Sequence, residues 1–154
     1  MAETSVPRTR FRRFTTVSAD HERLSVKLRR LHQLCKALES EQPALGPELD
    51  PVTLIAELLA ALTRHFAIEE ADAYFGTIVS ERPSVQHKIA GLKLEHTAML
   101  SVLVELRLLA EDDGRWKELA VPILRLIAQL QAHEHTENEL LQEFMLRDEG
   151  SSSD

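Results

Sequence analysis

The sequence predicts an all-α protein that folds as an antiparallel up-down-up-down four-helix bundle with an N-terminal arm. Hydrophobic residues make up 44% of the 154 residues, but only 5% are aromatic and five are glycine, which suits one domain with an aliphatic helical core. Val, Ile and Thr never alternate with polar residues over the length of a strand, which disfavours β-structure. Four segments instead repeat apolar residues at helical spacing, and the short connections between them favour antiparallel neighbours.

The first two helices are predicted from an apolar stripe and from residues that favour helix ends. Residues 17–39 carry the first stripe, with Ser18 available as an N-cap. A loop that contains two prolines and a glycine follows. Asp50 and Pro51 then suit the N-cap and the first position of a second helix, which is expected to continue to about residue 80.

The third and fourth helices are predicted in the same way. The third begins after Ser84 and ends before the turn residues at 112–114. The fourth stripe runs from Leu119 to Phe144. Pro122 lies inside it, and because proline cannot donate a backbone hydrogen bond we expect a kink or a late helix start there.

These helices define one predicted domain, residues 17–146, flanked by two short segments. Residues 1–16 form a basic and aromatic arm, in which four arginines and one glutamate leave a charge of about +3. Phe11 and Phe14 of this arm are expected to cover the open end of the bundle. Residues 147–154 are too polar to pack and are expected to form a flexible tail.

Composition argues against several classes of protein. A formal charge of −7 argues against general binding to nucleic acid or to an anionic membrane surface, which would need a surplus of lysine and arginine. No stretch approaches the roughly 20 apolar residues that span a bilayer. Cys35 is the only cysteine, so no internal disulfide forms, and it is expected to pack in the core. Since the N-terminus also lacks the apolar run of a signal peptide, we expect a cytoplasmic protein.

Two histidine and glutamate pairs lie on stripes that are otherwise apolar. In each pair the glutamate follows the histidine by four residues, so that both side chains point the same way. A lone histidine precedes each pair. At about 1.5 Å per residue, the histidines of the second and third helices lie roughly 22 Å and 18 Å from the turn that joins these helices, which are similar depths. The six candidate ligands are His21, His65, Glu69, His96, His133 and Glu137.

A bound metal explains these polar residues. Four imidazoles and two carboxylates left unpaired in an apolar bundle would each cost several kcal/mol. Mixed nitrogen and oxygen donors without a thiolate indicate iron, manganese or zinc, and two shareable carboxylates suit two metals better than one. An HExxH zinc hydrolase is disfavoured because Glu137 stands where a second histidine is needed. The ExxH motif of ferritin-like di-iron proteins is absent.

Other polar residues leave alternatives open. His135 with Glu139 is a reserve for His133 with Glu137, because His133 and His135 cannot face one metal from a regular helix. His32 and His87 are expected to lie at the surface or flank. Asp72 and Glu95 either orient the ligating imidazoles or are solvated charges, and the sequence favours neither.

Four stretches together resemble the hemerythrin-like HHE cation-binding domain. They are Ser18-Ala-Asp-His-Glu-Arg-Leu24, His65-Phe-Ala-Ile-Glu-Glu70, Glu95-His96 and His133-Glu-His-Thr-Glu-Asn-Glu-Leu-Leu141. The resemblance extends from residue 17 to about residue 145. It implies two non-haem iron ions bridged by an oxo or hydroxo group, which bind dioxygen or a related small ligand such as peroxide for sensing, storage or delivery.

The resemblance also implies a role for each candidate ligand. His21 and His65 would hold one iron, His96 and His133 the other, and both glutamates would bridge. An oxygen-carrying hemerythrin has a fifth histidine, four residues from that on the third helix, whereas Leu92 and Leu100 flank His96 here.

The missing nitrogen leaves the function open. Water, or a carboxylate such as Glu70 or Glu134, would fill its place, which favours sensing, storage or peroxide chemistry over reversible oxygen carriage. A di-iron oxidase or peroxide-decomposing enzyme is one alternative. A metal-free helical interaction module is the other.

Overall fold

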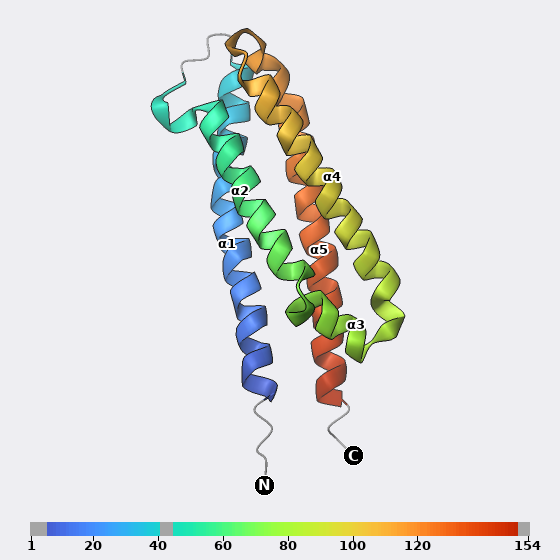
Figure 1. Cartoon of the computed structure of the whole chain (residues 1–154). Helices are drawn as coiled ribbons and strands as arrows, with labels where there is room; N and C mark the ends of the chain where they lie inside the picture. The colour runs from blue at the N-terminus through green and yellow to red at the C-terminus, as the bar shows by residue number, and fades with distance from the viewer. Residues whose placement is uncertain (1–5, 41–44, 151–154) are drawn as a thin grey trace.

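The structure, a computed structural model, describes residues 6–40 and 45–150, which are almost entirely helical (Figure 1). No strand occurs in these two ranges, and the all-α prediction is confirmed. The four long helices are α1 (Val6–Glu39), α2 (Pro51–Glu70), α4 (Gln86–Ala110) and α5 (Ala120–Gly150). The short elements between them are η1 (Pro47–Leu49), the π-helical turn η2 (Asp72–Gly76), α3 (Thr77–Glu81), η3 (Pro83–Val85) and η4 (Asp113–Leu119).

Each long helix packs against two of the others. α1 contacts α2 and α5, and α4 also contacts α2 and α5. In Figure 1 the lower ends of α1 and α5 lie on the same side of the molecule, whereas η1 and η4 lie at the upper end. The four helices therefore surround one central interior, into which each of them turns an apolar face.

That interior is divided into two apolar clusters. The larger one fills the upper part and includes Leu24 of α1, Phe66 of α2 and Leu130 of α5. The smaller one includes Val17 of α1 and Leu140 of α5. On α1 and α5 a short polar stretch separates the members of the two clusters, so the layer between the clusters is built from polar side chains.

The start of α2 and the start of α5 follow the sequence predictions. Asp50 is the N-cap of α2, because its carboxylate accepts hydrogen bonds from the Thr53 backbone N–H at 3.1 Å and from the Thr53 hydroxyl at 2.6 Å. Pro51 occupies the first helical position.

α5 begins at Ala120, so Pro122 lies in its first turn, where a backbone N–H has no partner within the helix. The late helix start expected there is observed.

Two predicted helix boundaries are wrong at the chain ends. α1 begins at Val6, so Ser18 lies inside the helix and is not its N-cap. Between Pro7 and Glu39 there is no proline or glycine, and Pro7 itself lies in the first turn of α1, where proline is tolerated. At the other end α5 continues to Gly150, which includes part of the predicted tail. Residues 151–154 and the side chains of Phe11 and Phe14 lie outside the described part of the structure.

The predicted continuation of the second helix to about residue 80 is also wrong. α2 ends at Glu70, and Ala71 is extended, with φ −63° and ψ 150°. The π-helical turn that follows brings Tyr74 and Phe75 into the interior, where they are 2% and 1% exposed. Because no proline or glycine stands at the break itself, its position has no local signal in the sequence. The break delivers aromatic side chains directly below the polar layer.

One feature of this region was not expected from the sequence. By length and composition alone, the segment Pro51–Glu81 is apolar enough to cross a membrane, a property that core helices of soluble proteins share. In this fold Ile55, Leu58 and Leu62 have no exposed surface and belong to the larger apolar cluster. The apolar character of α2 is therefore used in the interior of the bundle.

Candidate metal centre

The polar layer between the two apolar clusters contains all six candidate ligands. Each long helix contributes at least one of them, because one polar position on each helix lies at the same level of the bundle. Five are buried, and the His21 side chain is 14% exposed. Glu69 has no exposed surface at all. The structure thus brings together His21, His65, Glu69, His96, His133 and Glu137.

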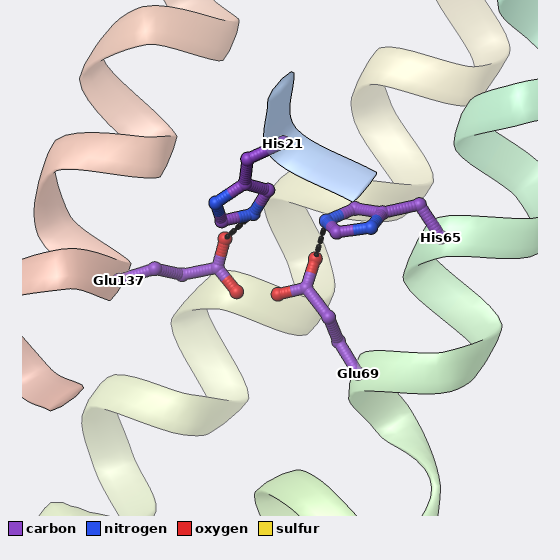
Figure 2. A group of neighbouring side chains, drawn as sticks. All are labelled: His21, His65, Glu69 and Glu137. Carbon is purple, nitrogen blue, oxygen red and sulfur yellow. Dashed lines mark ion pairs between the residues drawn. The ribbon is translucent and has the colours of Figure 1, made fainter. Parts of the chain in front are cut away.

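One half of the layer joins α1, α2 and α5 (Figure 2). His21 Nε2 lies 3.8 Å from Glu137 Oε2, and His65 Nε2 lies 2.7 Å from Glu69 Oε1. The rings of His21 and His65 approach each other with centroids 4.7 Å apart. As Figure 2 shows, the two carboxylates lie next to each other on the same side of the two rings, each beside one of them. All four donor atoms lie within 4.8 Å of one another, which is close enough to surround one ion.

The other half joins α2, α4 and α5. His96 Nε2 and His133 Nε2 are 3.0 Å apart. His96 Nε2 also lies 3.9 Å from Glu69 Oε1, and His133 Nε2 lies 3.5 Å from Glu137 Oε2. These four donors again lie within 4.8 Å of one another. The two groups share both carboxylates, an arrangement that suits two ions held side by side.

The protonation of two histidines suits ligation. Burial, together with the neighbouring His133 and His65, lowers the pKa of His96 to about 3. Burial also lowers the pKa of His21 to about 4, with His65 and His133 acting in the same direction. Both imidazoles are therefore neutral near pH 7, and the neutral imidazole is the form that binds a metal.

The protein alone provides few partners for the buried carboxylates of Glu69 and Glu137. Burial raises the pKa of Glu69, although its contact with His65 opposes the rise. Burial by itself would lower the pKa of His65, but Glu69 and Asp20 outweigh this effect and raise it. Glu69 Oε2 and both carboxylate oxygens of Glu137 are buried without a hydrogen-bond partner in the described residues. Each such atom carries a desolvation cost that a bound cation would remove.

The donors therefore fit a pair of metal ions. Four imidazoles and two carboxylates with no thiolate match iron, manganese or zinc. The sequence profile of the hemerythrin HHE cation binding domain matches residues 12–145. This chain belongs to that family. The resemblance noted from the sequence is confirmed over nearly the whole chain. No curated protein and no solved structure matches it significantly.

Several residues of this HHE domain surround the donors and were not predicted as part of the site. The ring of His96 stacks on Phe66, with centroids 3.8 Å apart and planes 8° apart, and on Phe75 at 5.9 Å and 12°. Asp20 is buried and lies 3.6 Å from His65 Nδ1. Asp20 directly precedes His21, but nothing in the sequence alone shows that it faces another helix.

Glu95 settles one alternative that the sequence left open. Its carboxylate lies 2.5 Å from His133 Nδ1, so it contacts the imidazole and is not merely a solvated charge. The side chain of Asp72 lies outside the described part of the structure. Two leucines flank His96 where a fifth histidine could stand: Leu92 is buried in the smaller apolar cluster, and Leu100 packs against the larger one.

Other candidates lie away from the donors. His135 and Glu139 form a 3.1 Å pair at the surface, 74% and 64% exposed, so this register does not enter the HHE site. His32 and His87 are exposed. Cys35 packs in the core as expected, where burial raises the pKa of its thiol to about 11.

Neither carboxylate suggested as a substitute ligand belongs to a donor group. Glu70 Oε2 lies 3.7 Å from His96 Nδ1, on the opposite side of the ring from the converging Nε2 atoms. Burial raises the pKa of Glu134, yet this residue is in neither group. The two halves therefore offer equal sets of protein donors, two nitrogens and two shared carboxylates each.

Proposed function

We propose that this HHE domain holds two iron ions and binds dioxygen or a related small ligand for sensing, storage or delivery. His21 and His65 would hold one iron, His96 and His133 the other, and Glu69 and Glu137 would bridge them. The observation that carries this proposal is the sharing of two buried, poorly partnered carboxylates by two groups of donors. We also propose that the four long helices form an antiparallel up-down-up-down bundle, because such bundles build metal sites from facing side chains.

Iron, when bound, supplies a redox-active Lewis acid with positions open to small oxygen ligands. The chain supplies the surroundings. The two apolar clusters exclude water above and below the layer. A cavity of about 440 Å³ lined by His65, Asp20 and Arg64 lies on one side, and one of about 270 Å³ lined by His133 and Glu95 lies on another. Both have room for a ligand of a few atoms, since one water occupies about 30 Å³ of liquid.

Metal analysis is the direct test. Protein produced in iron-rich medium is expected to carry about two irons per chain, because the two donor groups each surround one position. Optical spectra of the reduced protein before and after exposure to air would then report on dioxygen. A band that reverses under vacuum indicates binding. A chain without bound metal under these conditions would leave only the metal-free interaction module.

A peroxide-decomposing enzyme is the second candidate, favoured by one observation. Leu92 and Leu100 stand at the two positions four residues from His96, so the protein offers the His96 and His133 position no further nitrogen. Iron-loaded protein is then expected to consume peroxide catalytically, and a His133→Ala variant is expected to lose this activity. Steady-state assays of peroxide loss separate this outcome from simple binding.

A further inference from the structure

We propose that Glu95 and Asp20 are positioning residues of the metal centre. Glu95 holds the outer ring nitrogen of a ligating histidine on the neighbouring helix by a hydrogen bond, and Asp20 acts at a longer distance on the outer ring nitrogen of another. Asp20 of α1 acts on His65 of α2, and Glu95 of α4 acts on His133 of α5. The inference rests on the proposed metal binding and extends it to two residues outside the donor groups.

The two carboxylates occupy equivalent places in the sequence. Asp20 immediately precedes His21, and Glu95 immediately precedes His96. Successive residues of an α-helix are rotated by about 100°, so a histidine that points into the bundle leaves the preceding side chain directed toward an adjacent helix. The same arrangement therefore occurs in each half of the chain. Asp20 of α1 lies beside His65 of α2, and Glu95 of α4 lies beside His133 of α5.

The contacts follow this pattern in both halves. Glu95 Oε2 lies 2.5 Å from His133 Nδ1, and the Nε2 atom of the same ring lies 3.5 Å from Glu137. Asp20 Oδ2 lies 3.6 Å from His65 Nδ1, while Nε2 of that ring lies 2.7 Å from Glu69. In both rings Nδ1 faces an outer carboxylate and Nε2 faces a shared inner one.

The chemical consequence is a defined tautomer. When Nδ1–H donates to a carboxylate, the proton is held there and the lone pair of Nε2 is free for a metal. This matters most for His133, because its Nε2 lies only 3.0 Å from Nε2 of His96. With the His133 proton held on Nδ1 by Glu95, Nε2 of His133 accepts in this contact. Without Glu95, Nε2 of His133 is free to carry the proton, and its lone pair would no longer face the site.

The surroundings of the two carboxylates differ. Asp20 is buried, and its other oxygen lies 3.4 Å from Arg23 and 3.7 Å from Arg64, whose charges balance it. Glu95 is 56% exposed and reaches His133 from the rim of the cavity between α4 and α5. Since only Glu95 is within hydrogen-bonding distance of its histidine, we expect its removal to reduce metal affinity more than removal of Asp20.

The experiment compares Glu95→Ala, Glu95→Gln and Asp20→Asn with wild-type protein. Metal affinity is measured by equilibrium titration with ferrous iron under anaerobic conditions. Glu95→Ala is expected to weaken binding of one of the two metals by about 10- to 100-fold, the range found for removal of such an outer partner. Glu95→Gln retains a hydrogen-bond acceptor without the charge and is expected to lose less metal affinity than Glu95→Ala. Asp20→Asn is expected to weaken binding of the other metal.

A second readout needs no metal. Nitrogen-15 NMR of the metal-free protein is expected to show His133 protonated at Nδ1 in wild type, and to show that state lost in Glu95→Ala. Glu139→Ala is the matched control, because it removes the exposed partner of His135 on α5 and touches neither donor group. It is expected to change neither readout.

The outcomes are separable. Unchanged affinity and an unchanged His133 tautomer in the Glu95 variants would overturn the inference. If wild-type protein binds no metal, the proposed function fails, while the NMR comparison still decides whether Glu95 sets the tautomer. Should Glu95→Ala not fold, as judged by circular dichroism, Glu95→Gln carries the test, and wild-type affinity in that variant would count against the inference.

Discussion

Replacing Glu69 with alanine is expected to abolish binding of both metals, whereas replacing His21 or His96 is expected to remove only one. Glu69 belongs to both donor groups, while each of these histidines belongs to one. Loss of a shared carboxylate removes a donor from both positions, and it also leaves the two ions with only one of the two carboxylates that offset their mutual repulsion. Elemental analysis after equilibrium dialysis against ferrous iron measures the number of metals retained by each variant.

The control for this comparison is Glu105→Ala. Glu105 lies on α4 and is exposed, so its removal tests for a general effect of lost negative charge. We expect this variant to retain the metal content of wild type. Equal metal content in the Glu69 and His21 variants would show that the carboxylate is not shared. Full metal content in both would remove the case for this centre altogether.

The positions of the six donors were predictable because they depend on one helical period. A histidine and a glutamate one turn apart share a face, and a polar residue on an apolar stripe must lie in the interior. His65 with Glu69 and His133 with Glu137 satisfy both conditions, and they are buried at one level. The pair of His135 and Glu139 has the same spacing, but it does not lie on an apolar stripe, and it is exposed.

The rest of the site depends on contacts between helices, which the helical period does not encode. Nothing in the sequence distinguishes Asp20 from other acidic residues, because its contact with His65 forms only when α1 packs against α2. Phe75 was placed beside His96 by the break at Ala71, and no proline or glycine marks that break. The early start of α1 at Val6 was missed for a related reason, since nothing between residues 8 and 17 requires the helix to stop or to continue.

Replacing Glu137 with leucine is expected to stabilise the metal-free protein while preventing metal binding. Glu137 is 2% exposed, and neither carboxylate oxygen has a hydrogen-bond partner in the described residues. A buried polar group left unsatisfied costs about 1–3 kcal/mol, and leucine fills a similar volume beside Leu140 without that cost. Urea unfolding in the presence of a chelator is expected to show a higher free energy of unfolding for the variant than for wild type.

Adding iron is expected to make wild type more stable to urea than the Glu137→Leu variant. A ligand that binds only the native state stabilises it by about 2.7 kcal/mol at 100 times its dissociation constant, and the variant lacks a donor common to both groups. Glu139→Leu is the matched control, because Glu139 is exposed on the same helix and no donor group contains it. If metal-free wild type were the more stable protein, Glu137 would be satisfied by the chain itself. Higher stability of the variant without iron, and of wild type with it, would instead show a carboxylate retained for ligation at a cost to the fold.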